Sequence, residues 1–167
     1  SHEVHHLLAA RREDRLQVVS GILFSHMGAR QLGEYGMVVP RFVAQAVAGG
    51  ELTVYGDGSQ TRTFCDVRDV VGAMAGLAAA KELAGRVFNL GSDEPVTIDH
   101  LADRVVELAG SGRKKRVPFE QAYGAGFEEM HHRVPDLGAI RAAIGFAPEH
   151  SLDETLAGLI AAARGAG

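Results

Sequence analysis

The chain has 167 residues, of which 46% are hydrophobic and 23% charged, and its formal net charge is −4. This length predicts one domain spanning residues 1–167, and the net negative charge makes nucleic acid an unexpected partner. No apolar run approaches the roughly 20 residues that cross a bilayer, so we expect no membrane partner. Cys65 is the only cysteine, which rules out an intramolecular disulfide and suits a cytoplasmic protein.

Helical and strand-like segments alternate along the chain, as in an α/β protein. An amphipathic helix at 1–15 precedes an apolar strand at 17–24, whose β-branched residues are typical of a parallel sheet interior. Further helices are expected at 38–48, 69–81, 97–108, 136–144 and from 151 onward, and further strands at 52–55, 63–67, 87–90 and 116–119. The basic run at 113–116 is interpreted as a solvated connection.

Local signals mark the ends of several helices. Either Thr97 or Asp99 is expected to cap the helix that follows it. Ser151 and Glu154 have the spacing of a capping box at the start of the last helix. The apolar face of the helix at 69–81 is expected to hold Val70, Val71, Met74 and Leu77.

The most informative segment is residues 54–64, a short strand followed by a two-glycine turn and a second short strand. Gly56 and Gly58 provide the positive-φ geometry of a compact turn, which exposes backbone N–H groups. Arg62 follows that turn, where its planar fork of donors is well placed to clamp a phosphate. A plain hairpin turn with an exposed arginine is the simpler interpretation of the segment alone. The neighbouring segments must therefore decide between a plain turn and a phosphate-binding one.

Several segments, taken in order, resemble the C-terminal half of extended short-chain dehydrogenases that act on nucleotide sugars. These are the NAD-dependent epimerases, dehydratases and UDP-glucuronate decarboxylases. The matching stretches are residues 24–31, 35–42, 52–71, 87–91, 133–137 and 144–154. The resemblance implies an α/β fold class: the C-terminal part of a Rossmann-like extended short-chain dehydrogenase, with one or two parallel strands plus the small α/β substrate-binding domain.

The resemblance also implies which residues contact a UDP- or dTDP-linked sugar. Tyr55 is expected near the base, with the backbone around Val39 lying against that base. Gln60 and Arg62 are expected to reach the ribose and the diphosphate. A diphosphate carries enough negative charge to need two or more bidentate donors in a partly desolvated cleft.

Ser25 and Arg133 complete the expected substrate-binding set. The position of Ser25 normally carries an asparagine that touches the sugar nucleotide, and Arg133 lies in a segment that supplies a second phosphate contact. Two further departures from the family pattern are Ala29, in place of a proline, and His132, in place of one of two paired arginines. Each change weakens a substrate contact, which indicates a relaxed or altered site.

Two motifs of the family are missing from the sequence. There is no G-x-G-x-x-G dinucleotide fingerprint, and none of Tyr35, Tyr55 and Tyr123 has a lysine four residues later. Ser1 aligns at or just beyond the family's catalytic lysine, so a truncated chain is expected. NAD is therefore expected for the full family architecture, with none bound by this chain alone, and no catalytic residue is assigned.

Other candidate sites have simpler structural explanations. His2 and His6 have the spacing of two metal ligands on a helix, but an exposed terminus explains them better, so no metal site is expected. Cys65 is expected to be a buried thiol that packs as a small hydrophobe rather than a nucleophile.

Two functions remain open. One is the nucleotide-sugar-binding portion of an NAD-dependent epimerase, dehydratase or decarboxylase, inactive as an isolated chain. The alternative is a non-catalytic remnant that acts as a nucleotide-sugar-binding or protein-interaction module. Lost sheet neighbours would expose the strand at 18–24, so we expect either a homo-oligomer or a missing Rossmann partner chain that completes the sheet.

Overall fold

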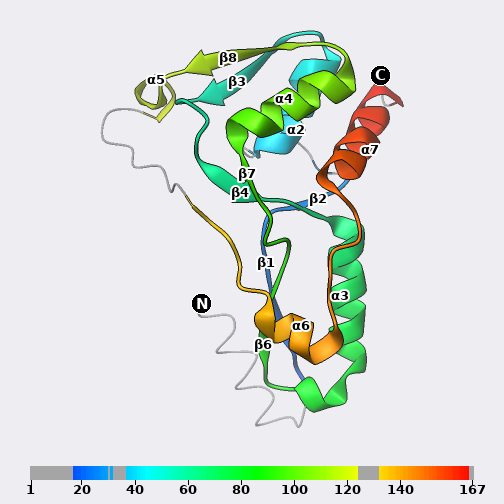
Figure 1. Cartoon of the computed structure of the whole chain (residues 1–167). Coiled ribbons are helices and arrows are strands. Elements are labelled where there is room, and N and C mark those ends of the chain that lie inside the picture. Colours follow the sequence, from blue (N-terminus) through cyan, green and yellow to red (C-terminus); the bar gives the residue numbers. More distant parts are fainter. Residues whose placement is uncertain (1–16, 30, 32–36, 124–131, 166–167) are drawn as a thin grey trace.

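Figure 1 shows the computed structural model of the chain, which describes residues 17–29, 31, 37–123 and 132–165. The helix expected at 1–15, with His2 and His6, lies outside these residues. The described strands form four two-stranded ladders. Three ladders are parallel: β1 (Ser20–Leu23) with β6 (Val87–Leu90), β2 (His26–Met27) with β5 (Cys65–Asp66), and β3 (Glu51–Tyr55) with β8 (Arg113–Val117). The fourth joins β4 (Thr61–Thr63) and β7 (Pro95–Thr97) in antiparallel fashion.

Helices connect the strands, as parallel pairing requires. The described helices are α2 (Val38–Val47), α3 (Val67–Ala79), the short 3₁₀ helix η2 (Lys81–Leu83), α4 (Ile98–Ala109), α5 (Phe119–Tyr123), α6 (Gly138–Ile144) and α7 (Leu152–Gly165). Each helix expected within the described residues is confirmed to within two residues at its start. Parallel ladders joined through helices confirm the expected α/β class.

Two of the expected helix caps are present. The Thr97 side chain accepts a hydrogen bond from the His100 backbone N–H at 3.1 Å, so Thr97, and not Asp99, caps α4. The capping box at the start of α7 is confirmed, because the Glu154 N–H donates to Ser151 Oγ and the Ser151 N–H donates to Glu154 Oε2. Local sequence signals therefore fix both helix starts.

Two hydrophobic clusters stabilise the fold. In the first, α2, α4 and α7 pack around β3, and its fully buried members include Phe42, Leu52, Leu101, Val105 and Leu156. In the second, α3 and α6 pack on β6, with Val70, Leu77, Phe88, Leu90 and Ile140 inside. Figure 1 shows these groups at opposite ends of the molecule, with β2, β4 and β7 between them.

Residues 54–64 do not form a hairpin. The strands on either side of the turn belong to different ladders, because β3 pairs with β8 while β4 pairs with β7. The strand expected at 63–67 is also wrong as one element: it is divided between β4 and β5 at Phe64. Both partner strands lie far along the chain, and local patterns carry no information about such pairing.

The basic run at 113–116 is part of strand β8, so its interpretation as a connection is wrong, although three of its four side chains are solvated as expected. Its cations alternate between the two faces of the strand. Those at 113 and 115 contact Glu51 at 2.8 and 2.7 Å, and those at 114 and 116 contact Asp99 at 2.9 and 3.1 Å. The run is therefore paired with carboxylates and begins three residues before the strand expected at 116–119.

The expected apolar face of α3 is only half correct. Val70 and Leu77 are buried, whereas the side chains of Val71 and Met74 are 58% and 52% exposed. The helix turns Ala73 toward the core instead, because positions 70, 73 and 77 share one side of a helix. Val71 and Met74 therefore form exposed apolar surface.

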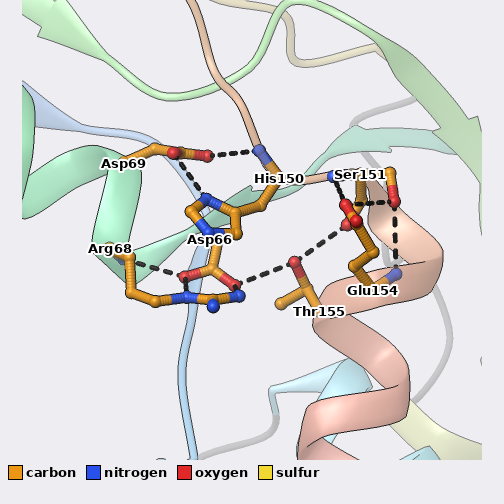
Figure 2. A network of polar contacts seen from close by, with 7 residues as sticks. All are labelled: Asp66, Arg68, Asp69, His150, Ser151, Glu154 and Thr155. Carbon is orange, nitrogen blue, oxygen red and sulfur yellow. Dashed lines mark hydrogen bonds and ion pairs between the residues drawn. The ribbon is translucent and has the colours of Figure 1, made fainter.

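Two buried carboxylates at the start of α3 hold the C-terminal segment in place (Figure 2). Asp66 caps α3, binds the Arg68 guanidinium through both oxygens at 2.7 and 2.9 Å, and accepts a hydrogen bond from Thr155 Oγ1 at 3.0 Å. Asp69 lies 2.7 Å from His150 Nδ1 and accepts from the His150 N–H at 3.2 Å. The hydrogen bonds from Arg68 hold the pKa of Asp66 well below its usual range.

We expect the contribution of Asp66 to stability to depend on pH. Because its pKa is lower in the folded than in the unfolded chain, ionised Asp66 stabilises the fold fully above the ordinary aspartate pKa. That contribution is lost as the pH falls through the folded-state pKa. Asp66→Asn should lower the free energy of unfolding by about 1–3 kcal/mol at pH 7, and by less below about pH 4, in urea unfolding measurements.

Asp103→Asn is the matched control, because Asp103 is an exposed aspartate with one ion pair, to Lys114 at 2.8 Å. Exposed pairs contribute little, so this change should cost about 0–1 kcal/mol. An Asp66→Asn loss that is the same at pH 3 and pH 7, or no larger than that of the control, would contradict the assignment.

Candidate functional site

A pocket of about 340 Å³ lies between the start of α2, the end of β3, β4 and the β1–β2 connection. Residues far apart in the sequence meet there. The pocket lining includes five of the six expected substrate-binding residues, namely Ser25, Val39, Tyr55, Gln60 and Arg62. The ordered segments that suggested a common site are therefore brought together in space.

The turn between β3 and β4 depends on its two glycines. Gly56 and Gly58 have φ angles of 68° and 77°, the left-handed region that favours glycine. Gln60 is buried, and its side-chain amide donates to the Tyr55 carbonyl oxygen at 3.3 Å, closing the turn on itself. The backbone oxygens of Gly58 and Gln60 accept hydrogen bonds from the first residues of α4. Hydrogen bonds therefore hold the turn to the start of α4, and it is not a free loop.

Arg62 is half-buried on strand β4 and lines the pocket. Its Nη1 donates to the Thr61 carbonyl oxygen at 2.7 Å, which orients the guanidinium. Phe64, two residues further along, contributes an aromatic wall. Arg62 therefore lies on the pocket wall, and its role in phosphate binding stays a prediction.

Arg41 is a second arginine in the pocket. It was not among the site residues expected from the sequence. Its guanidinium carbon lies 4.7 Å from the centre of the Tyr55 ring and 5.5 Å from that of Phe42. Its Nη2 donates to the Thr53 carbonyl oxygen at 3.1 Å, while its Nε is buried without a hydrogen-bond partner among the described residues. The one available signal was its place in the first turn of α2, immediately after Pro40.

The electrostatics of the pocket favour an anion. Arg41 and Arg62 both line it, and the described lining residues include no aspartate or glutamate. The first turn of α2 also lines it, and that helix has neither an acidic residue in its first turn nor a side-chain cap at Met37. A helix N-terminus carries partial positive charge, so it adds to the field of the two guanidinium groups.

Ser25 and Arg133 lie at the edge of this arrangement. Ser25 lines the pocket with a φ of 27°, a conformation that asparagine tolerates better than serine. Arg133 is exposed and outside the lining, with its guanidinium carbon 5.6 Å from the centre of the Phe24 ring. His132 Nδ1 lies 2.8 Å from Thr61 Oγ1, so residues 132–133 run beside the strand that carries Arg62. The role of Arg133 in phosphate binding stays a prediction.

Burial raises the pKa of the Cys65 thiol to about 12, and the side chain is 2% exposed, which confirms the expected buried thiol. Along the described residues, no group of three or more His, Cys, Asp or Glu side chains is arranged to hold a metal ion. None of the described helices has both the length and the apolar composition that crossing a membrane requires.

Comparison with known proteins identifies the family. Residues 2–91 match the NAD dependent epimerase/dehydratase family, and the chain belongs to it. It is 38% identical over 125 residues to a UDP-N-acetyl-alpha-D-glucosaminuronate decarboxylase of Bacillus cytotoxicus, covering 74% of this chain and 39% of that protein. It is 30% identical over 148 residues to UDP-glucuronic acid decarboxylase 1 of Xenopus tropicalis, covering 89% of this chain and 34% of that protein. The chain thus spans well under half the length of these relatives.

Solved structures show the same fold. A UDP-glucuronic acid 4-epimerase mutant from Bacillus cereus, in complex with UDP-4-deoxy-4-fluoro-glucuronic acid and NAD, matches with a TM-score of 0.83 at 21% identity, covering 98% of this chain and 50% of its own. A dTDP-glucose 4,6-dehydratase from Bacillus anthracis, in complex with NAD, matches with a TM-score of 0.78 at 19% identity, covering 96% and 49%. These matches confirm the expected Rossmann-like fold class.

The starts of α3 and α4 do not fit the pyrophosphate of NAD, the cofactor that the family implies. In the dinucleotide fingerprint, glycine backbone and a free helix N-terminus receive the phosphates. Here the first turn of α3 is occupied by the carboxylates of Asp66 and Asp69, and that of α4 holds Asp99. Negative charge at these helix starts opposes phosphate binding.

We expect the two-glycine turn to tolerate no side chain at Gly58. A Cβ there would lie 2.8 Å from Asp99 Cβ and 2.9 Å from Val54 Cγ1, at a φ that L-residues rarely adopt. Gly58→Ala should therefore lower the free energy of unfolding by about 1–3 kcal/mol, measured by urea unfolding. Gly72→Ala is the control: Gly72 lies within α3 with open space around it, so alanine should stabilise the chain by about 0.5–1 kcal/mol. Equal effects at both glycines would contradict this account of the turn.

Proposed function

We propose that this chain is the nucleotide-sugar-binding portion of an NAD-dependent epimerase, dehydratase or decarboxylase, and that it does not catalyse turnover by itself. The observation that carries the proposal is one pocket that combines two arginines and a helix N-terminus, with no carboxylate among its described lining residues. Together these groups give the pocket a positive field, which favours an anion such as a diphosphate. The proteins named above carry the names of enzymes for UDP- or dTDP-linked sugars, which supports such a sugar as the ligand.

The pocket offers separate surfaces for the parts of such a ligand. Arg62 on β4 would hold the diphosphate through its planar fork of donors. The apolar start of α2, around Val39, together with the Tyr55 ring would pack against a flat base. Ser25 and His26, at the β1–β2 connection, would face the sugar.

The catalytic steps would need groups from outside these 167 residues. The sequence contains neither the family's Tyr-x-x-x-Lys nor its dinucleotide fingerprint. The only thiol, Cys65, is buried and protonated at neutral pH. The dinucleotide-binding half would then be supplied by another segment or another chain.

We expect binding without turnover. In isothermal titration calorimetry, UDP and UDP-glucuronic acid should bind the 167-residue chain saturably, and Arg62→Gln should weaken both by about tenfold or more because a charge-assisted contact is lost. Neither UDP- nor dTDP-sugars should be converted to product when incubated with the chain and NAD.

Arg86→Gln is the matched control for Arg62→Gln. Arg86 is an exposed arginine outside the pocket, with its guanidinium carbon 4.9 Å from the centre of the Phe88 ring. UDP affinity should be unchanged in this variant. Absence of any UDP binding would overturn the proposed function, and turnover of a nucleotide sugar by the chain alone would overturn its inactive part.

We also propose that the chain associates with itself or with a dinucleotide-binding half through the β1–β6 ladder. Ile22 and Leu23 on β1 are 43% and 41% exposed, and exposed apolar strands promote association. Sedimentation velocity at micromolar concentration should show dimers or larger species, which Ile22→Ser with Leu23→Ser should reduce. Val134→Ser, at another exposed apolar residue, is the control. A purely monomeric chain would contradict self-association, and association without any nucleotide binding would favour the alternative of an interaction module.

A further inference from the structure

Arg41 stands among the apolar residues of the pocket, apart from the strand that carries Arg62. It follows Val38, Val39 and Pro40 in the first turn of α2, and its guanidinium lies over the Tyr55 ring. An aromatic ring beside an aliphatic wall suits a flat heterocycle better than a diphosphate. The cation at this end of the pocket therefore adds to the field that attracts a diphosphate without itself being placed to contact the phosphates.

The position of Arg41 is fixed by hydrogen bonds behind it. Its Nη2 donates to the Thr53 carbonyl oxygen at 3.1 Å. Thr53 is held in turn by Gln45, because the Thr53 N–H donates to Gln45 Oε1 at 3.1 Å and Gln45 Nε2 donates to Thr53 Oγ1 at 3.2 Å. The guanidinium is thus oriented before any ligand arrives.

One donor of this fixed group is unsatisfied. Arg41 Nε is buried and has no hydrogen-bond partner among the described residues. A buried donor without an acceptor is costly, and a ligand oxygen that reached it would remove that cost. A guanidinium has only donors, so the complementary ligand atom must be an acceptor.

We infer that Arg41 is a specificity-determining residue that faces position 4 of a pyrimidine base and selects bases with a carbonyl oxygen there, such as uracil and thymine, over cytosine, which has an amino group there. Position 4 of the pyrimidine ring decides this, since it is a carbonyl acceptor in thymine and uracil and an amino donor in cytosine. An amino group facing Arg41 would leave donors unpaired on both sides. The inference rests on the proposed function, because it concerns the base end of the same pocket.

Arg41 and Arg62 then have separable roles. Arg62 would contact the diphosphate, which UDP, dTDP and CDP share, so its loss should weaken all three nucleotides alike. Arg41 would contact the base, so its loss should change the ratio of their affinities. This difference distinguishes the two arginines in one binding assay.

The test compares UDP, dTDP and CDP by calorimetry on the 167-residue chain. UDP and dTDP should bind about tenfold or more tightly than CDP, because one buried donor goes unpaired with cytosine. Arg41→Met, which keeps much of the aliphatic stem, should reduce that ratio to about twofold or less, and Arg41→Lys should reduce it too, because lysine lacks the planar fork. Arg86→Met, at an arginine that also stacks on an aromatic ring but lies outside the pocket, should leave the ratio unchanged.

Each other outcome overturns the inference in a different way. Equal binding of UDP and CDP by the unsubstituted chain overturns it without any variant, so a misfolded Arg41→Met cannot obscure the result. A uniform loss of affinity for all three nucleotides in both Arg41 variants would make Arg41 a phosphate contact. If UDP binds but its preference over CDP survives in both variants, the inference alone fails. If no nucleotide binds, the proposed function fails with it.

Discussion

The carboxylate of Asp66 joins three parts of the chain through hydrogen bonds made below the protein surface. It caps α3, accepts a hydrogen bond from Thr155 on α7, and belongs to β5, which pairs with β2. The neighbouring Cys65 N–H donates to the carbonyl oxygen of Ser25, at the edge of the pocket. Since an ionised carboxylate is buried only when its partners are in place, these segments must assemble together. The shape of the pocket thus depends on a negative charge outside it.

The two arginines in the pocket are prepared for ligand in the same way. Arg41 donates to the carbonyl oxygen of Thr53 and Arg62 to that of Thr61, so backbone atoms orient both guanidinium groups. A cation oriented by the protein loses less conformational freedom on binding than one that must be immobilised by the ligand. The described residues that line the pocket include no acidic side chain, so this described lining is net positive.

Sequence signals succeeded where the determining physics is local. The glycines of the β3–β4 turn, Thr97 as a helix cap and the capping box of α7 act within a few residues, and the structure contains each as expected. The site residues of the same segments could be grouped from the sequence because the order of those segments along the chain matched a known family. Arg41 was missed because its place in the pocket arises only where α2 packs against the end of β3. The pairing of β3 with β8 was missed for the same reason, since ladder partners are chosen by tertiary packing.

The alternating ion pairs of β8 determine how this strand aligns with β3. A strand reading Arg-Lys-Lys-Arg-Val has almost no hydrophobic pattern to fix its alignment with β3. Glu51 on one face and Asp99 on the other supply that information, because each receives two alternate cations. A slip of one residue would turn every cation away from its carboxylate. Surface charges that add little to stability can therefore still specify a unique register.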